Sequence, residues 1–212
     1  MLKVNEIFYS IQGESTHCGR PCVFIRLTGC NLRCRYCDTR YAYEEGQKMK
    51  LEAILEKTDY YNTKLVEITG GEPLIQKETP ELCQQLLDKG YEVLVETNGT
   101  RSIRELPKKI RRILDIKCPG SGELEKIHWE NFKYLRSGDE VKFVLSDIDD
   151  YLWAKTFLNE KHFRSNIPVL FSPVFGQLDP RNLANWILQD KLNVRLHLQI
   201  HKIIWPQEGR GR

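Results

Sequence analysis

The chain has 212 residues, of which 41% are hydrophobic and 29% charged, a balance typical of one folded globular domain that excludes a largely disordered chain. The net charge is only +3, so no strong field marks a nucleic-acid or membrane-surface binder. No apolar run approaches the roughly 18 residues of a membrane helix, and residues 1–15 lack a signal peptide, so we expect a cytoplasmic protein without a membrane partner.

Short runs of β-branched and aromatic residues alternate with segments of helical periodicity, which is typical of repeated β/α units. In chain order, strands are predicted at residues 22–27, 65–69, 91–96, 112–117, 140–145, 168–171 and 194–199. Helices are predicted at residues 51–57, 80–89, 149–159 and 180–190. The connections after the third and fourth of these strands are less clearly helical.

Two of the predicted strands, YEVLVE and VLFSPV, are almost continuously apolar, as expected for parallel strands covered on both faces. A closed eight-unit (β/α) barrel usually takes about 250 residues. The 212 residues therefore predict an α/β fold, an incomplete (β/α) barrel of about six parallel strands with some helices shortened. No linker or repeat divides the chain, so we expect one domain over residues 1–212.

Ligands of parallel β/α folds bind at the carboxyl ends of the strands, where the loops carry the chemistry. Polar or glycine-rich segments follow five of the predicted strands: TGCNLRCRYCDT, TGGEP, ETNGT, KCPGSG and SPVFGQLDP. We therefore expect these loops to converge on one rim of the sheet and to form the functional site there.

Three of the seven cysteines, Cys30, Cys34 and Cys37, have the spacing C-x3-C-x2-C. The odd total of seven cysteines and the missing secretory signal argue against a disulfide framework. Three thiolates on one loop suit a metal centre, and an iron–sulfur cluster with three cysteines leaves one iron open to a ligand. Unpaired buried thiols remain an alternative, as does a zinc site completed by a distant ligand such as Cys83, Cys118 or a histidine.

With Tyr36 directly before the third cysteine, the triplet resembles the signature of the radical S-adenosylmethionine (SAM) superfamily. The resemblance implies a [4Fe–4S] cluster whose open iron binds SAM, and reductive cleavage of SAM to methionine and a 5′-deoxyadenosyl radical. Residues 70–73 are similar to the superfamily's GGEP motif, in which small residues admit the methionyl ammonium and Glu72 pairs with it. A tight strand-to-helix turn is the structural alternative.

Further segments resemble the 7-carboxy-7-deazaguanine synthases within this superfamily. They are IFYSIQGE, Arg26 within CVFIRLTGCN, Asp38-Thr39, and the weaker ETNGT, DIKCPGSGE, SPVFGQLDP and LQIHKIIW. The resemblance implies conversion of 6-carboxy-5,6,7,8-tetrahydropterin into 7-carboxy-7-deazaguanine, on the way to queuosine and related deazapurines. The implied steps are abstraction of the pterin C6 hydrogen, ring contraction and loss of ammonia, with SAM regenerated, which makes the enzyme a lyase.

The resemblance also implies the residues of the site. The hydroxyl of Thr39 is expected to bind Mg²⁺ that bridges to substrate oxygens, and Arg26 to offer a planar fork to the substrate carboxylate. The other expected substrate contacts are Ile11, Gln12, Gly13, Glu14, Thr69 and His201. The expected SAM contacts are Tyr36, Cys37, Asp38, Gly71, Glu72, Asp115, Ile116, Lys117, Ser172, Pro173, Val174 and Phe175.

Several of these residues have ordinary structural alternatives. Alternation along a strand leaves Arg26 facing either the site or solvent. Thr39 fits a helix N-cap, and His201 fits a structural histidine. Cys18 and Cys22 repeat the C-x3-C spacing, and we interpret them as ordinary thiols.

The densest basic run, at residues 107–112, is interpreted as a solvated segment before a strand, so no nucleic-acid partner is expected. The resemblance implies a homodimer and a reducing electron donor such as flavodoxin or ferredoxin. Two rival functions stay open at this point. One is an activating enzyme of the same superfamily that makes a glycyl radical on a partner protein, and the other is a zinc-stabilised binding module.

Overall fold

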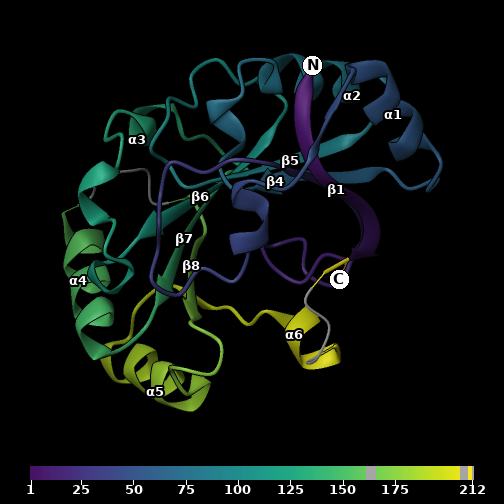
Figure 1. Ribbon diagram of the computed structural model, residues 1–212. Coiled ribbons are helices and arrows are strands. Elements are labelled where there is room, and N and C mark those ends of the chain that lie inside the picture. Colours follow the sequence, from purple (N-terminus) through teal and green to yellow (C-terminus); the bar gives the residue numbers. More distant parts are fainter. Residues whose placement is uncertain (161–165, 206–209, 212) are drawn as a thin grey trace.

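The computed structural model describes residues 1–160, 166–205 and 210–211 (Figure 1). Within these residues the strands form one sheet in the order β3-β1-β2-β4-β5-β6-β7-β8-β9. The strands are β1 (Leu2–Ile11), β2 (Pro21–Leu27), β3 (Gln47–Met49), β4 (Leu65–Gly70), β5 (Glu92–Thr97), β6 (Arg111–Lys117), β7 (Glu140–Leu145), β8 (Val169–Pro173) and β9 (Arg195–Leu196).

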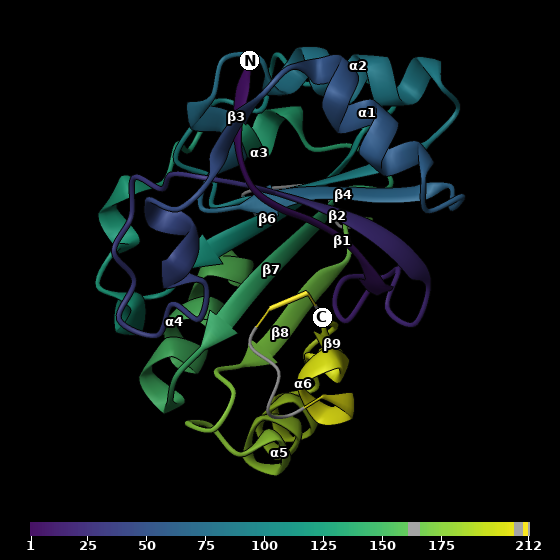
Figure 2. The ribbon, with the colours of Figure 1, turned by 45° about the vertical axis from the view of Figure 1, so that its right-hand side comes forward.

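From β2 onward, the neighbouring strands β2, β4, β5, β6, β7, β8 and β9 are parallel. Strand β1 is antiparallel to β2, and β3 is antiparallel to β1. The sheet ends at β3 and β9 without closing, and Figure 2 shows that the sheet is curved. The structure therefore confirms the predicted incomplete (β/α) barrel.

The α-helices largely follow the predicted positions. They are α1 (Leu51–Asp59), α2 (Thr79–Asp88), α3 (Asn131–Tyr134), α4 (Ile148–Asn159), α5 (Pro180–Asp190) and α6 (Ile200–Ile204). Single 3-10 turns lie at Arg40–Tyr43, Pro73–Ile75, Pro119–Ser121 and Leu124–Lys126. No helix lies between β5 and β6, and only short ones lie between β6 and β7, as the weak periodicity there indicated. None of the helices described is long and apolar enough to cross a membrane.

Side-chain caps fix the starts of the two longest helices. The Asp147 carboxylate accepts a hydrogen bond from the backbone N–H of Asp150 at 3.0 Å, which begins α4. Asp179 accepts one from the N–H of Arg181 at 2.8 Å, and Pro180 takes the first position of α5. The caps fix where each loop ends and its helix begins. The two helices then carry the chain along the outer face of the sheet.

Strands β1 and β3 were not predicted from the sequence. Residues 7–14 of β1 and the following loop were interpreted as a binding motif, although the burial of LKVNEIFYSI alternates for part of its length in the way of a half-covered strand. Strand β1 pairs along β2 and carries the chain to residues 12–14 at the barrel interior. Strand β3 has only three residues and no apolar run, so nothing in its sequence distinguishes it from a loop.

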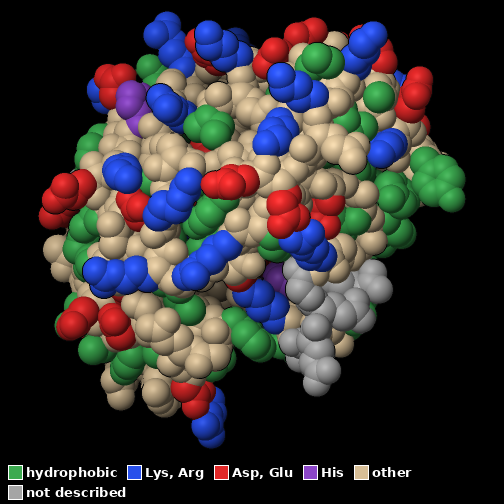
Figure 3. All heavy atoms as spheres, viewed as in Figure 1, with side chains coloured by type: hydrophobic (Ala, Val, Ile, Leu, Met, Phe, Trp, Pro, Cys, Tyr) green, Lys and Arg blue, Asp and Glu red, His purple; other side chains and the backbone are tan. Residues whose placement is uncertain are grey.

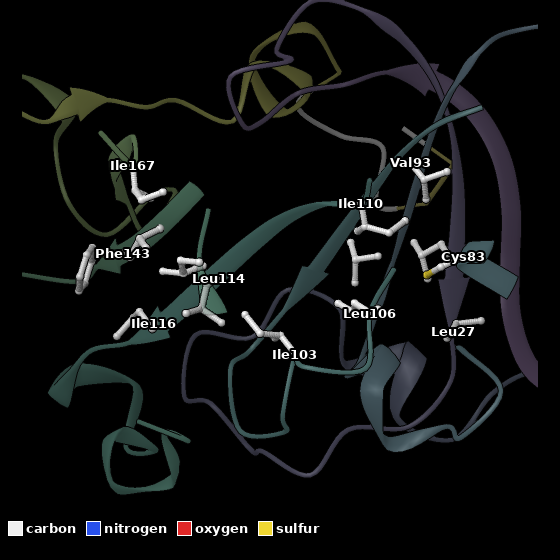
Figure 4. Close-up of a cluster of buried hydrophobic side chains, with 14 of the residues drawn as sticks. Leu27, Cys83, Val93, Ile103, Leu106, Ile110, Leu114, Ile116, Phe143 and Ile167 are labelled. Atoms are coloured by element: carbon white, nitrogen blue, oxygen red, sulfur yellow. The ribbon is translucent and has the colours of Figure 1, made fainter. Parts of the chain in front are cut away.

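The two faces of the sheet have different contents because alternate strand residues point to opposite sides. On the outer face, residues such as Ile25, Val95 and Phe143 pack beneath the helices in the main core, part of which is drawn in Figure 4. On the inner face, a smaller apolar cluster fills the amino-terminal end of the barrel. Its members are Phe8, Cys22, Phe24, Leu65, Leu94 and Ile113. Toward the carboxyl ends of the strands, the inner face of the sheet carries polar residues.

Candidate active site

The carboxyl ends of the parallel strands surround a cavity of about 560 Å³. The loop after β2 supplies one wall, and Cys30, Cys34 and Cys37 all border the cavity. The Cys30 sulfur accepts a hydrogen bond from the backbone N–H of Leu32 at 3.4 Å. All seven cysteines are free thiols. Those that do not border the cavity are Cys18, Cys22, Cys83 and Cys118.

The cysteine triplet meets at one place in the structure. Cys30, Cys34 and Cys37 border the same cavity although they lie on an irregular loop. Iron–sulfur clusters are held by cysteine thiolates, and three of them leave one iron open to another ligand. Three thiols bordering one cavity therefore suit the cluster that the sequence predicts.

The GGEP segment, residues 70–73, forms a tight turn against the loop after β2 that carries Cys30, Cys34 and Cys37, which we call the cysteine loop. Gly70 has a φ of +136°, and a Cβ on it would lie 2.1 Å from the backbone oxygen of Leu27. A Cβ on Gly71 would lie 2.0 Å from the backbone oxygen of Gly29. Both positions require glycine because another backbone segment passes within contact distance. The N–H of Glu72 donates to the same Gly29 oxygen at 2.7 Å and fixes the cysteine loop to β4.

The Glu72 side chain is not part of the cavity lining. Its carboxylate accepts hydrogen bonds from the Leu74 N–H at 2.9 Å, the Thr97 hydroxyl at 2.8 Å and the Asn98 N–H at 2.7 Å. Burial raises the pKa of Glu72 to about 7, while these bonds favour its charged form. The carboxylate therefore joins the loops after β4 and β5, and its predicted contact with SAM stays a prediction.

Strand register places a row of charged side chains on the inner face. Asp115 of β6 lies directly opposite Lys142 of β7, while Glu67 of β4 is aligned with Leu94, two residues before Glu96 of β5. All four charged residues border the cavity. Glu67, Glu96 and Lys142 were not predicted from the sequence. The available signal was a charged residue flanked by apolar ones within each strand, in LVEITG, EVLVET and EVKFVL.

Lys142 is the centre of this charged group. Its Nζ lies 2.7 Å from Glu14 Oε2 and 3.6 Å from Asp115 Oδ2, and it also forms an ion pair with Glu96. A second lysine, Lys117, lies 2.8 Å from Asp115 Oδ2. Burial disfavours the charged form of Glu14, but the neighbouring Lys142 ammonium holds the pKa of Glu14 well below its ordinary value. Glu14 is therefore a carboxylate at the cavity wall.

Gln12 binds protein groups at both ends of its side-chain amide. Its Nε2 donates to Glu67, and its Oε1 accepts from the Glu14 N–H at 3.0 Å. Burial, followed by the charges of Glu96 and Glu14, raises the pKa of Glu67 well above its ordinary value. The Gln12 side chain thus holds the loop that carries Glu14, and its predicted contact with substrate stays a prediction.

Arg26 lies on the inner face because β2 pairs with β4 in a register that aligns Arg26 with Thr69. Its Nε lies 2.7 Å from Glu6 Oε1 of β1, and its guanidinium carbon lies 5.6 Å from the centre of the Phe8 ring. The side chain borders the cavity and is only 14% exposed. Of the two orientations that strand alternation allowed, the structure has the one that faces the site.

Helix α6 and the residue before it lie against the loop after β1 and complete the cavity wall. Gln199 Nε2 donates to Glu14 Oε1 at 2.7 Å, and the Ile200 N–H donates to the Gly13 oxygen at 3.1 Å. His201 borders the cavity, and a Cβ on Gly13 would lie 2.1 Å from its Nδ1. Gly13 of the IQGE motif is therefore small because His201 occupies the space beside it.

The residues around the third cysteine also contact distant elements. The Tyr36 hydroxyl donates to the Val144 oxygen at 3.2 Å, and Asp38 forms an ion pair with Lys202 of α6. Thr39 stands at the start of a 3-10 turn without a capping hydrogen bond from its side chain. Its hydroxyl donates instead to Asp38 Oδ1 at 2.9 Å. The structure therefore does not bear out the alternative in which the Thr39 side chain caps a helix.

Most of the predicted site residues border the cavity. They are Ile11, Gln12, Gly13, Glu14, Arg26, Cys30, Cys34, Tyr36, Cys37, Asp38, Thr39, Thr69, Gly71, Asp115, Lys117, Val174, Phe175 and His201. Those that do not border it are Glu72, Ile116, Ser172 and Pro173. Ile116 packs in the main core because it faces the opposite side of β6 from its neighbours Asp115 and Lys117. Asn98, Gln199, Lys202 and Trp205 also border the cavity and were not predicted as site residues.

Comparison with known proteins gives consistent matches over the chain. The family model for the radical SAM superfamily matches residues 24–119. A 7-carboxy-7-deazaguanine synthase from Koribacter versatilis is 42% identical, over 99% of this chain and 100% of its own length. Proteins of the same name from Chlorobaculum tepidum and Thermoplasma acidophilum are 44% and 36% identical, over 99% and 95% of this chain and 97% and 96% of their own.

Solved structures show the same fold. QueE from Escherichia coli superposes with a TM-score of 0.71 at 23% identity, covering 93% of each chain. SuiB from Streptococcus suis bound to S-adenosylmethionine has a TM-score of 0.56 at 16% identity, covering 81% of this chain and 48% of its own. These likenesses support the open barrel described above.

Proposed function

The chain belongs to the 7-carboxy-7-deazaguanine synthases of the radical SAM superfamily, and on this premise we propose that it converts 6-carboxy-5,6,7,8-tetrahydropterin into 7-carboxy-7-deazaguanine with loss of ammonia. The observation that carries the proposal is one cavity bordered both by the cysteine triplet and by the charged inner face of the barrel. The thiols suit the radical chemistry, and the charged face suits a small, hydrogen-bonding substrate.

Cys30, Cys34 and Cys37 would hold the [4Fe–4S] cluster. A bound cluster and SAM supply the 5′-deoxyadenosyl radical that takes the pterin C6 hydrogen. The residues of this chain bind and orient the reactants and keep water from the radical. Within the proposal, Gly71 has no side chain and so leaves room for SAM at the turn beside the cysteine loop. The other proposed SAM contacts lie at or after the carboxyl ends of the strands. These contacts are Tyr36, Asp38, Asp115, Lys117, Val174 and Phe175.

The substrate would lie against the inner face, between β2 and the loop after β1. The recorded ion pair of Arg26 uses its Nε, so we assign its terminal nitrogens to the substrate carboxylate. Glu14 presents a carboxylate that accepts hydrogen bonds from pterin N–H groups. Thr69 and His201 border the same part of the cavity and complete the proposed contacts.

We assign Mg²⁺ to the hydroxyl of Thr39. Mg²⁺ prefers oxygen ligands and keeps several that are water or substrate, so one protein ligand suffices when the substrate supplies others. Thr39 borders the cavity, and its hydroxyl donates to Asp38 and makes no capping hydrogen bond. This supports the assignment because the hydroxyl oxygen keeps lone pairs that could bind a metal ion.

The family resemblance also supports a homodimer, a cytoplasmic location and a one-electron donor protein such as flavodoxin or ferredoxin. The cysteine loop carries Arg33, Arg35 and Arg40 at exposed positions. Within the described residues none of the three forms an ion pair with an acidic side chain. Exposed cations beside the cluster ligands complement an acidic donor, and opposite charges accelerate encounter between proteins.

Anaerobic reconstitution and turnover test the proposed function. We expect brown protein with about four irons per chain, and conversion of the carboxytetrahydropterin to 7-carboxy-7-deazaguanine, detected by mass. Colourless protein containing zinc would refute the radical chemistry. Loaded enzyme that cleaves SAM but leaves this pterin unchanged would refute the substrate while leaving the superfamily chemistry intact.

A further inference from the structure

A single buried ammonium contacts three carboxylates from three separate parts of the chain. Lys142 stands in the middle of β7 with a side chain only 4% exposed. Its partners are Glu14 after β1, Glu96 at the end of β5 and Asp115 in β6. Among the described residues, no other cation forms an ion pair with Glu14 or Glu96. Lys142 is therefore the common counterion of these three carboxylates. Neither a sequence motif nor the family resemblance links Lys142 to them.

Resting on the proposed function, we propose that Lys142 is a positioning residue of the pterin site, whose ammonium holds the Glu14 and Glu96 carboxylates at the cavity wall to accept hydrogen bonds from the substrate. A tetrahydropterin is rich in donors, because its ring nitrogens and its exocyclic amino group carry N–H bonds. An ionised carboxylate is acceptor-only and matches such donors. The acid-rich wall thus complements the substrate ring, while Arg26 serves its carboxylate.

The charge arrangement shows why the carboxylates need this lysine. Glu14, Glu67, Glu96 and Asp115 border one cavity, and like charges at close range in a low-dielectric site drive carboxyl groups to take up protons. Burial raises the pKa of Glu96 even with Lys142 beside it, since the lysine offsets burial only in part. At Glu14 the lysine and hydrogen bonds outweigh burial. Removing the ammonium would therefore neutralise the acceptors that face the substrate.

The charges around Lys142 favour a positioning role over proton transfer. Burial disfavours its ammonium form, but the surrounding Glu14, Glu96 and Asp115 raise its pKa well above the ordinary value. A lysine with a raised pKa does not release its proton readily. Glu14 is further held by Gln199 at 2.7 Å and by the Gln12 oxygen on its N–H at 3.0 Å. Lys142 adds a third contact that holds Glu14 at the cavity wall.

The experiment compares wild-type enzyme with Lys142→Met, Lys142→Arg, Glu14→Gln and the double variant Lys142→Met/Glu14→Gln, all loaded with cluster and SAM. Binding of the product 7-carboxy-7-deazaguanine is measured by calorimetry, and KM and kcat with the carboxytetrahydropterin. We expect Lys142→Met to weaken product binding and raise KM by about tenfold to a hundredfold. Lys142→Arg should recover part of this loss because it restores the charge.

Two further readouts separate positioning from a general structural role. If Lys142 acts through Glu14, the double variant loses little more affinity than Lys142→Met alone. In Lys142→Met the acid limb of kcat/KM should also move to higher pH, because burial without the counterion raises the carboxyl pKa values. The titratable groups that face Glu14 or Glu96 are Cys18, Asp38, Glu67, Asp115, Lys142, His197 and His201.

The matched control is Arg112→Met, which removes a buried cation from its ion pair with Asp139 outside the cavity. It should lower the melting temperature without moving the pH profile. Unchanged KM and pH profile in Lys142→Met would overturn the proposal, as would fully additive losses in the double variant. Wild-type enzyme that converts the pterin in the same assay keeps the proposed function, so failure of the Lys142 proposal is distinguishable from failure of that function.

Discussion

Cys34 is the buried member of the cysteine triplet, and its backbone oxygen accepts a hydrogen bond from the Cys37 N–H at 3.2 Å. We expect Cys34→Ala to lose the cluster because two cysteines remain where three ligands are needed. Iron analysis and anaerobic assay of 5′-deoxyadenosine measure this, with Cys83→Ala as the control for a buried thiol outside the cavity. Retained SAM cleavage in Cys34→Ala would show that the triplet does not hold the cluster.

Thr39 offers a second test at the scale of one side chain. We expect Thr39→Ala to keep the iron content and SAM cleavage of the wild type but to need several times more Mg²⁺ for half-maximal turnover, because a ligand oxygen is lost. Thr39→Ser keeps the hydroxyl and should behave like the wild type. An identical Mg²⁺ response in Thr39→Ala would remove this residue from the metal site.

Individual site residues were predictable where a motif carries them and were missed where only the fold brings them together. The cysteine triplet, Arg26 and Thr39 stand in or beside recognisable motifs. Glu67 and Lys142 are charged residues flanked by apolar ones in their strands, and they come to border one cavity only through the register of several strands. Sequence spacing does not specify that register, since a shift of one residue would send each side chain to the other face.

Helix α6 is the element whose packing most directly shapes the cavity, and Gly13→Ala tests its docking. The added Cβ would lie 2.1 Å from His201 Nδ1, so the helix must shift. A displacement of about 1 Å can cost a hundredfold in rate, and we expect KM to rise and kcat to fall. Trypsin should also cleave faster after Lys202, once its contact with Asp38 loosens.

Gly90→Ala is the control for this change, because a Cβ on Gly90 meets no atom within 4 Å. Its positive φ of +79° makes alanine strained there, so the melting temperature falls while cleavage after Lys202 stays slow. If Gly13→Ala is cleaved no faster than Gly90→Ala and keeps its KM, α6 does not depend on the contact between Gly13 and His201.

Elements with one strong pattern were predicted well. The parallel strands have apolar runs of ordinary length, and the main helices have apolar faces with proline or aspartate at their starts. Short elements such as β3, β9 and α6 were missed or misjudged, because a few residues carry too little periodicity to indicate a structure. These elements are held by tertiary contacts, as Gln199 and Ile200 show in their hydrogen bonds to the loop after β1.

At the scale of the whole molecule, the distribution of charge matters more than the small net charge. In Figure 3, several Lys and Arg side chains lie over the face on which Figure 1 draws the cysteine loop. We expect Arg35→Glu to slow turnover supported by reduced flavodoxin by about tenfold at low ionic strength, with less effect at high salt. Turnover supported by dithionite, which needs no docking, should be unchanged.

Lys108→Glu is the matched control, because Lys108 is equally exposed but precedes β6 at the amino-terminal end of the barrel. It should leave both rates unchanged. Equal slowing by Arg35→Glu and Lys108→Glu would indicate a general effect of net charge, and no slowing by Arg35→Glu would exclude the cysteine loop as the donor's contact surface.

The cavity wall is built from both ends of the chain, since the loop after β1 and helix α6 meet there. Synthesis starts at the amino terminus, so the cysteine loop is made long before residues 200–204 of α6. This wall of the cavity therefore cannot close beside the three thiols until α6 has been made and has packed against the loop after β1.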